Sequence, residues 1–387
     1  MDPKEKKKSA QKNNQSASHK LLESLVYKAI QVGASDLHVK SDRSPAIRKD
    51  RKLVLLPELN KGFGDRVLTA FIRDLLSKEE WKKFELGEDL DVAYTLRDKY
   101  RFRLNIYRDR GKLSLAFRRI PREIPLFRDL HLPDILSQLA MEKKGLVLVT
   151  GAAGNGKSTT LASMLNYRNA NTEGHILTLE DPIEFLLEEN KSLITQRQVG
   201  QDVPDFLSGL KSSLRQDPDV IMLGEMRDAD TFLTAMSAAE TGQLVFSTLH
   251  TRDSMESLSR VLSFFNPDQR AGIKRQFAGC LKAVVSLRLI PAVAHSDLKT
   301  GMVPGCEILV NTPHIKELLL QDTDKWSELR NALETGKIYG MQSLDQSIME
   351  LFEKNWISRE RAVEYASSKD NMELRLRGIH NNFDDAA

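Results

Sequence analysis

The hydrophobic pattern in the middle of the chain predicts parallel strands that are buried on both faces and alternate with helices. Four short apolar runs have the length and composition of such strands. They are LVLVT at 146–150, HILTL at 175–179, VIML at 220–223 and LVFSTL at 244–249. A further apolar run at 283–290 extends the same sheet. Strands separated by helices in this way predict a doubly wound α/β domain.

The N-terminal part of the chain has a different pattern, with a period of two residues. Residues 90–96, 100–108 and 113–119 alternate between apolar and polar side chains, as strands do when one face of a sheet is buried. Further strands are expected at 35–39 and 46–56, and helices at 21–30, 68–76 and 78–84. We therefore expect a small α+β domain, built on an antiparallel sheet, at residues 20–120.

The remaining segments are expected to flank or join these domains. Residues 1–19 are polar and charged and predict a disordered tail, whose KEKKK run is better explained as solvated than as bound to acidic lipid or nucleic acid. Residues 121–133 carry Pro121, Pro125 and Pro133 and predict a linker that would act as a hinge. We place the α/β domain at residues 134–310 and a C-terminal helical region at 311–387. Helices are expected there at 315–321, 326–334, 343–355 and 359–365.

Composition narrows the class of protein without naming a substrate. The chain has 387 residues, 41% hydrophobic and 29% charged, with a formal net charge of +3. A charge this small does not favour a nucleic acid or a membrane surface as partner. No apolar stretch is long enough to span a membrane, and the N-terminus lacks the apolar core of a secretory signal. The two cysteines, Cys280 and Cys306, are expected to be reduced structural thiols of a cytoplasmic protein.

The candidate chemistry is concentrated in a glycine-rich segment that follows the first buried strand. Residues 151–158 read GAAGNGKS and match the phosphate-binding pattern G-x-x-x-x-G-K-[ST]. Glycines let backbone N–H groups approach a phosphate, and the helix that follows adds the partial positive charge of its N-terminus. The lysine reaches the β- and γ-phosphates, and the serine hydroxyl can sit on Mg²⁺. We predict that ATP is bound here by Gly151, Gly154, Asn155, Gly156, Lys157, Ser158 and Thr159.

Acidic residues follow the next two buried strands. Ligands gather at the carboxyl ends of parallel strands, so the acids of Glu180–Glu184 are expected near the phosphates, although one carboxylate in such a loop would ordinarily be solvated. Glu225 follows the strand at 220–223 in the Walker B arrangement, with Gly224 in the usual aspartate position. Glu225 would therefore hold Mg²⁺ through water or orient the attacking water.

A histidine and a row of arginines could each either contact a nucleotide or have a purely structural role. His250 follows the strand at 244–249, where it could sense the γ-phosphate or be a satisfied structural histidine. In RFRLNIY, Arg101, Arg103 and Asn105 share one face of a strand. That face is either solvated or turned toward a nucleotide, since guanidinium groups stabilise charge on transferring phosphate oxygens. With the glycine-rich loop, these features predict a RecA-like nucleotide domain.

Taken together, these motifs resemble those of the secretion ATPases of type II secretion and type IV pili. The segments that carry the resemblance are GAAGNGKSTTL, ILTLEDPIEF, DPDVIMLGEMRD, AAETG and STLHTRD. ASDLHV and RFRLNIYRDRG resemble the PAS-like N-terminal domain of the retraction ATPases PilT and PilU, so that the resemblance covers residues 20–377. It implies a cytoplasmic homo-hexamer at the inner membrane that uses Mg-ATP to retract type IV pili in twitching motility. It also implies an inner-membrane platform protein as partner. No nucleic acid would be bound, and the chain would associate with the membrane only through the pilus machine.

The resemblance also implies roles for single residues. Arg103 and Arg118 fall on the family's nucleotide-contacting arginines, which favours function for the arginine face. Glu184 falls on the Asp-box glutamate, Glu225 on the Walker B glutamate and His250 on the second His-box histidine. The implied metal ligands are Ser158 and Glu225. ATP would lie between the two domains, and hydrolysis would rotate one domain against its neighbour.

Several departures from the family pattern bear on the subfamily. The chain has no tetracysteine motif and no extra N-terminal domain, which favours the retraction branch, and its C-terminal segment resembles that of PilU. Gln243 replaces the first His-box histidine, and HIKELLLQ replaces the PilT motif A-I-R-N-L-I-R-E, with Lys316 and Leu320 in the arginine positions. We therefore expect an accessory PilU-like motor that works with a second PilT-type ATPase. A principal PilT motor and an ATP-binding regulatory subunit with little turnover are the alternatives; a DNA translocase is disfavoured by the near-neutral charge.

Overall fold

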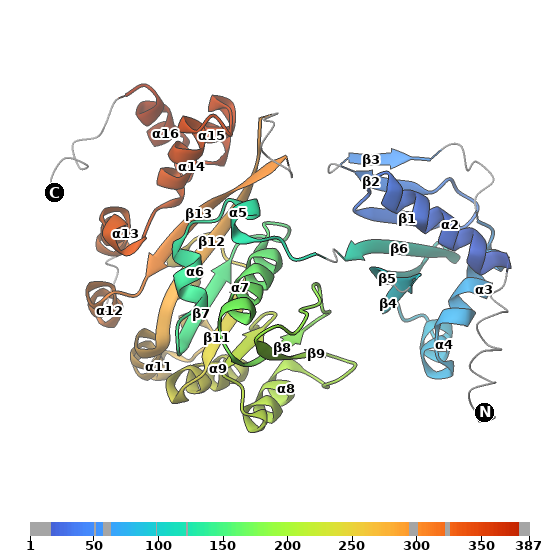
Figure 1. Cartoon of the computed structure of the whole chain (residues 1–387), viewed down its shortest axis with the longest axis horizontal. Coiled ribbons are helices and arrows are strands. Elements are labelled where there is room, and N and C mark those ends of the chain that lie inside the picture. The colour runs from blue at the N-terminus through green and yellow to red at the C-terminus, as the bar shows by residue number, and fades with distance from the viewer. Residues whose placement is uncertain are drawn as a thin grey trace. The chain divides into compact units, whose positions relative to one another are not determined.

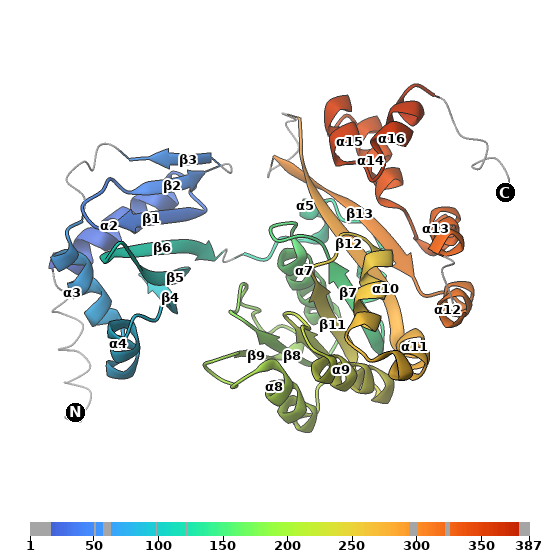
Figure 2. The same cartoon turned by 180° about the vertical axis from the view of Figure 1, so that it is seen from behind.

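The chain divides into two units, residues 1–122 and residues 123–387, which are described separately. The computed structural model describes residues 17–49, 52–56, 63–97, 99–120, 123–293, 301–321 and 326–378 (Figures 1 and 2). The expected N-terminal tail falls outside these ranges as far as residue 16. Helix α2 begins at Ala17, three residues before the expected start of structure.

The first unit is a six-stranded antiparallel sheet in the order β3-β2-β1-β6-β5-β4. Its strands are β1 Asp36–Lys40, β2 Ala46–Lys49, β3 Lys52–Leu55, β4 Leu90–Leu96, β5 Tyr100–Asp109 and β6 Lys112–Ile120. Its helices are α2 Ala17–Gln31, α3 Asp65–Leu75 and α4 Lys78–Glu85. The helices pack on one face of the sheet, where alternate side chains such as Phe102, Leu104 and Ile106 are buried. The two-residue period therefore predicted this face correctly.

The second unit is built on a seven-stranded sheet in the order β13-β12-β7-β11-β10-β8-β9. Neighbouring strands are parallel except for the antiparallel pair of β12 and β13. The strands are β7 Gly145–Thr150, β8 Gly174–Glu180, β9 Ser192–Gln198, β10 Val220–Leu223, β11 Leu244–Leu249, β12 Leu281–Pro291 and β13 Met302–Val310. The predicted α/β fold, with an antiparallel α+β part before it and helices after it, is confirmed.

Helices cover both faces of this sheet (Figures 1 and 2). The helices of the second unit are α5 Phe127–Leu130, α6 Ile135–Ala140, α7 Lys157–Asn171, α8 Phe206–Ser213, α9 Ala229–Thr241, α10 Ser254–Ser263, α11 Pro267–Cys280, α12 Pro313–Leu320, α13 Trp326–Thr335, α14 Leu344–Glu353, α15 Arg359–Tyr365 and α16 Lys369–Leu376. The 3₁₀ turns are Leu214–Gln216 and Lys337–Tyr339. No helix in the described ranges is long and apolar enough to cross a membrane.

Three features differ from the sequence prediction. The edge strands β9 and β13 were not predicted, because SLITQRQ is mostly polar and Pro304 and Gly305 interrupt the apolar run of β13. An edge strand tolerates proline because one side of it has no strand to pair with. The third difference concerns the linker expected at 121–133, because most of its residues lie in the second unit. Ile124, Phe127 and Leu130 pack against the core of the second unit, so residues 123–133 belong to that unit.

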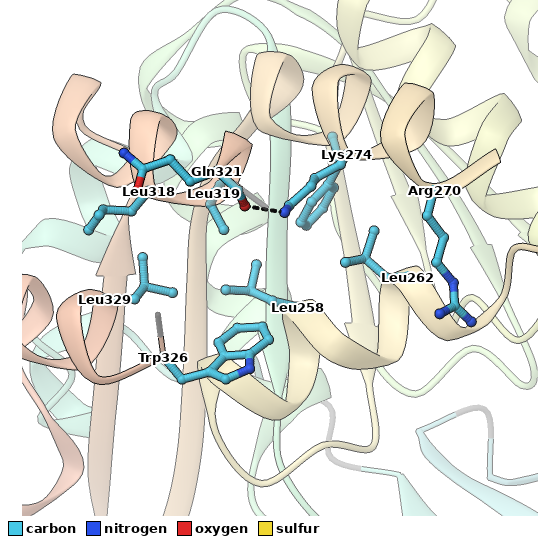
Figure 3. Close-up of a pocket in the computed structure, with 10 residues that line it drawn as sticks. Leu258, Leu262, Arg270, Lys274, Leu318, Leu319, Gln321, Trp326 and Leu329 are labelled. Atoms are coloured by element: carbon cyan, nitrogen blue, oxygen red, sulfur yellow. Dashed lines mark hydrogen bonds between the residues drawn. The ribbon is translucent and has the colours of Figure 1, made fainter. Parts of the chain in front are cut away.

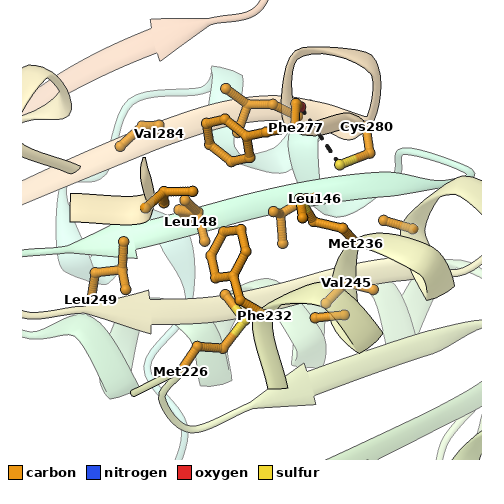
Figure 4. Close-up of a cluster of buried hydrophobic side chains, with 14 of the residues drawn as sticks. Leu146, Leu148, Met226, Phe232, Met236, Val245, Leu249, Phe277, Cys280 and Val284 are labelled. Atoms are coloured by element: carbon orange, nitrogen blue, oxygen red, sulfur yellow. Dashed lines mark hydrogen bonds between the residues drawn. The ribbon is translucent and has the colours of Figure 1, made fainter. Parts of the chain in front are cut away.

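The core of the second unit has one layer on each face of the sheet around β7, and a separate cluster joins β12 and β13 to the C-terminal helices. Leu146 and Leu148 of β7 point into the cluster with α9 and α11, and Val147 and Val149 point into the cluster with α7. Figure 4 shows the first layer around Phe232. A strand buried on both faces must be apolar throughout, which is why the run at 146–150 carries no polar side chain before Thr150.

We expect Phe232→Ala to lower the free energy of unfolding of the second unit by about 3–5 kcal/mol. The Phe232 side chain is fully buried and its ring lies 5.8 Å from that of Phe277, so truncation leaves a cavity. Urea unfolding followed by circular dichroism measures the change. Leu193→Ala, at a side chain that is 55% exposed, is the matched control and should change stability by less than about 1 kcal/mol. Equal losses in both variants would contradict the burial argument.

Candidate active site

The glycine-rich loop joins β7 to α7 at the carboxyl edge of the parallel sheet, and its backbone needs glycine at defined positions. Gly151 has a φ of +138°, and a Cβ atom there would lie 2.5 Å from the carbonyl oxygen of Leu287. Gly154 and Gly156 have φ values of +79° and +86°, in the left-handed region that other residues rarely adopt. The loop therefore has the glycine-dependent backbone conformation that a phosphate-binding turn requires.

Lys157 lies at the first position of α7 and folds back over the loop. Its Nζ donates hydrogen bonds to the carbonyl oxygens of Gly151 at 2.8 Å and Ala152 at 3.2 Å. Burial lowers the pKa of Lys157, and the carboxylates of Glu184 and Glu225 oppose that effect. The ammonium group is therefore close to both of the acids that the sequence singled out.

The other loop residues divide between candidate ligand contacts and structural support. Ser158 and Thr159 are half-buried in the first turn of α7. The side-chain oxygen of Asn155 instead accepts a hydrogen bond from the backbone N–H of Leu289 at 3.3 Å. Asn155 thus ties the loop to β12 in addition to any contact that it makes with a nucleotide.

Glu225 follows β10 and is the centre of a charged cluster. Its carboxylate forms an ion pair with Arg227, and its second oxygen lies 3.5 Å from Nε2 of His250. Glu225 is mostly buried, whereas Arg227 and His250 have side chains that are 73% and 59% exposed. Sequence reasoning did not single out Arg227, although its place in GEMRD beside the Walker B glutamate was a usable signal.

Parallel register brings these groups to one edge of the sheet. Leu223 pairs with Leu179 of β8 and with Ser247 of β11, so the residues that follow each strand emerge together. Gly224 closes this junction: its N–H donates to the carbonyl of Leu179 at 2.8 Å, and its carbonyl accepts from the Thr248 hydroxyl at 2.6 Å. A Cβ atom on Gly224 would lie 3.4 Å from the carbonyl oxygen of Leu179, an ordinary van der Waals contact, so packing alone does not explain glycine where Walker B motifs usually have aspartate.

The two glutamates after β8 have different environments. Glu180 is 7% exposed and accepts hydrogen bonds from Thr178 at 2.6 Å and Gln196 at 3.1 Å. Burial raises the pKa of Glu180, against these hydrogen bonds. Its other oxygen accepts from the backbone N–H of Glu184 at 3.4 Å. Glu180 therefore supports the loop, and Glu184 is the carboxylate that lies close to Lys157.

This difference gives a pH prediction. The folded state favours the protonated form of Glu180, so wild-type stability should fall as the pH rises above the carboxyl's ordinary value, near 4.5. Glu180→Gln has no proton to lose there, so its stability relative to wild type should rise between pH 4 and pH 8. Urea unfolding at each pH measures this difference. Exposed Glu173→Gln is the control, and a pH-independent difference for Glu180→Gln would refute the assignment.

The two predicted arginines of the first unit are neighbours across two strands. Arg103 of β5 is directly opposite Arg118 of β6 on the polar face of the sheet. Arg103 donates to Asp91 through Nε and Nη2, both at 3.2 Å, and Arg118 donates to Asp36 at 2.9 Å. Both side chains remain substantially exposed, at 41% and 71%. The aspartates orient the guanidinium groups without burying them.

Two family departures lie away from the carboxyl edge of the sheet. Gln243 immediately precedes β11, and its carbonyl accepts from the N–H of Gly145 at the start of β7, so it lies at the opposite edge from Lys157. Lys316 and Leu320 are both exposed on α12. Within this unit, the replacement of the first His-box histidine by Gln243 therefore lies away from the phosphate-binding loop.

A separate cavity of about 350 Å³ lies among α10, α11, α12 and α13 (Figure 3). Its walls are mainly leucine, with Phe277 and Trp326, and Lys274 donates to the carbonyl of Gln321 across it. No carboxylate lines this cavity within the described residues. It therefore lacks the acid and base groups of the cluster around Lys157.

The glycine-rich loop, its lysine and the carboxylates at the ends of β8 and β10 define a P-loop ATPase on a doubly wound sheet. The family of type II/IV secretion system proteins matches residues 11–309, and the chain belongs to this family, in the branch of the type IV pilus retraction ATPases.

Comparison with individual proteins gives the same result. The chain is 38% identical to the type IV pilus retractation ATPase PilT of Pseudomonas aeruginosa over 91% of this chain and 99% of that protein. It is 33% identical to the type IV pilus ATPase PilU of the same organism, over 92% and 91% of the two chains. A crystal structure of the pilus retraction motor PilT with bound ADP superposes with a TM-score of 0.81 at 34% identity, covering 91% of this chain and 98% of that one.

Proposed function

We propose that this chain hydrolyses Mg-ATP to drive type IV pilus retraction in twitching motility. The observation that carries the proposal is the convergence of Lys157, Glu184, Glu225 and His250 at one edge of the parallel sheet. The similarity to PilT and PilU supports the pilus as the place of action.

The donor set at this edge fits Mg²⁺. The Ser158 hydroxyl and the carboxylate of Glu225 are hard oxygen ligands of the kind that Mg²⁺ prefers. No group of three or more acidic, histidine or cysteine side chains that could hold a metal ion occurs among the described residues. This agrees with an ion bound by one or two protein groups together with nucleotide phosphates and water. The ion would supply charge neutralisation at the phosphates.

The residues of the cluster have distinct proposed roles. The ammonium of Lys157 binds the β- and γ-phosphates with the loop N–H groups. Glu225 accepts the proton of the attacking water or orients it, and Glu184 adds a second carboxylate beside Lys157. His250 donates to the γ-phosphate. Arg227, which pairs with Glu225, holds that carboxylate at the mouth of the site.

We further propose that Arg103 and Arg118 contact nucleotide within a homo-hexamer, where they stabilise phosphate charge. Arg103→Gln and Arg118→Gln should each lower the turnover number by roughly tenfold or more, because a guanidinium can be worth far more than that in phosphoryl transfer. Steady-state phosphate release measures the effect. Arg66→Gln removes the same charge from an exposed position of the first unit and should leave turnover unchanged. Loss of turnover with Arg66→Gln would point to a general charge effect instead.

The cellular setting is also part of the proposal. We place the hexamer at the cytoplasmic face of the inner membrane, against a platform protein, with a second PilT-type ATPase as co-motor. Domain boundaries of 134–310 for the ATPase domain and 311–387 for the helical region belong to the same proposal. A deletion strain tests it: normal pilus number with weak retraction supports an accessory PilU-like motor, and absence of pili would contradict a retraction role.

A principal PilT-like motor is the second candidate. It is favoured by the higher identity to PilT, 38% against 33% for PilU. It is disfavoured by Lys316 and Leu320 at the arginine positions of the PilT motif. Excess pili and complete loss of twitching in the deletion strain would select this candidate.

A further inference from the structure

The first unit has a small polar pocket at the end of its sheet. It lies where β1 ends and where the turn Arg110–Gly111 joins β5 to β6, and its volume is about 140 Å³. That volume is below the roughly 300–1,000 Å³ of sites for drug-sized ligands, so it suits a single small group. Ser114, in its wall, is four residues from Arg118 along β6, about 13 Å at a strand rise of roughly 3.3 Å per residue. The pocket is therefore distinct from the pair of arginines on this sheet.

Two buried hydroxyl groups of this pocket lack a partner among the described residues. Ser114 is 1% exposed, and its Oγ makes no hydrogen bond within the described part of the chain. Ser41, 2% exposed, lines the same pocket, and its Oγ likewise makes no hydrogen bond within the described residues, although the nearby Ser41 hydroxyl lowers the pKa of Asp65. Buried polar groups are nearly always paired, so the Ser114 hydroxyl indicates a ligand atom that accepts a hydrogen bond there.

The charges around the pocket leave two cations uncommitted. Lys40 pairs with Asp109 and Lys112 pairs with Asp42, each at 2.8 Å, so these four groups neutralise one another. The guanidinium groups of Arg43 and Arg110 line the same pocket, and neither has an ion pair or hydrogen bond with any described residue. Lys40 chiefly, and then Arg110 and Arg43, lower the pKa of Asp109, which lines the same pocket.

The backbone presents Arg110 in an unusual way. Arg110 and Gly111 both have positive φ values, +55° and +77°, as the central residues of a tight hairpin turn. Asparagine, aspartate or glycine is preferred at the first of these positions. An arginine there accepts a conformational cost, and Arg110 is one of the residues that line the pocket.

We propose that Arg43, Arg110 and Ser114 form a phosphate-binding site on the N-terminal unit, separate from the ATP site. Arginine forks match phosphate oxygens, and the hydroxyl supplies a third, buried donor. The phosphate can belong to a free anion or to a phospholipid headgroup, since both present the same oxygens.

Two probes distinguish these sources in the full-length chain. The background variant is Lys157→Ala, which removes the main phosphate contact of the ATP site. Isothermal titration with inorganic phosphate tests the free anion, and flotation with phosphatidylglycerol vesicles against phosphatidylcholine vesicles tests the headgroup. Arg43→Gln/Arg110→Gln should weaken binding of the active probe roughly tenfold or more. Ser114→Ala should weaken it by about threefold or more, with both guanidinium groups retained.

The matched control removes the same charge from the same unit. Lys82→Gln/Lys83→Gln changes two exposed lysines on α4 and should leave binding unchanged. Circular dichroism confirms that each variant is folded. Saturable binding of phosphate or of anionic vesicles that is lost only in the pocket variants supports the site. No saturable binding of either probe, or equal weakening by the control pair, would overturn it. Neither result depends on ATP hydrolysis, so the proposed motor function is tested separately.

Discussion

Glu225→Gln is expected to bind ATP with wild-type affinity and to lose steady-state turnover by about 10²–10⁴-fold, the usual contribution of a general base. The glutamine side chain keeps the size of the glutamate and can still hydrogen-bond. It cannot accept a proton or balance the charge of Arg227, which forms an ion pair with Glu225. Steady-state phosphate release measures turnover, and calorimetric titration with ATP measures affinity.

The control for this prediction is Glu173→Gln, an exposed glutamate of the same unit, which should keep full turnover. Glu184→Gln separates the two carboxylates near Lys157. Wild-type turnover in Glu225→Gln, together with its loss in Glu184→Gln, would move the catalytic base to Glu184. Loss of ATP affinity in Glu225→Gln would instead indicate that the carboxylate acts chiefly in binding.

Lys157→Ala is expected to lower ATP affinity by roughly a hundredfold or more. Hydrogen bonds to charged groups contribute about 1.5–3 kcal/mol each, and the lysine can make two to the β- and γ-phosphates. Every 1.4 kcal/mol corresponds to about a tenfold change in affinity. The lysine is already held over the loop by the carbonyls of Gly151 and Ala152, so little conformational freedom is lost on binding.

Calorimetric titration of the variant with ATP checks this value. Lys191→Ala removes an exposed lysine of the same unit and should bind ATP as wild type does. Because Lys157 also bonds to its own loop, thermal unfolding of the variant is needed to show that the fold is intact. A folded Lys157→Ala chain with wild-type ATP affinity would refute the assignment of the phosphate site.

The sequence alone determined the elements that hold the site. The runs 146–149 and 244–246 are apolar at every position, as a core on both faces of the sheet requires, and the period of two residues in β5 identified its buried face. The glycine-rich loop could be assigned because glycine, lysine and serine at this spacing are typical of phosphate-binding loops. These signals are local: the residues that carry them lie within a few positions of one another.

Tertiary structure alone decided the relations between distant segments. Glu180 and Glu184 are both glutamates of the loop after β8, and the sequence does not distinguish their roles. In the structure Glu180 is buried and accepts hydrogen bonds from Thr178 and Gln196, so it stabilises the loop, whereas Glu184 lies near Lys157. Gln243 and His250 belong to one motif, yet the six-residue strand β11 carries them to opposite edges of the sheet. Arg227 and the pocket around Ser114 gave no periodic signal, because their partners come from other segments. Hydrophobic period records which face of an element is buried, whereas the partners of a charge or hydroxyl depend on strand order and register, which only the folded chain fixes.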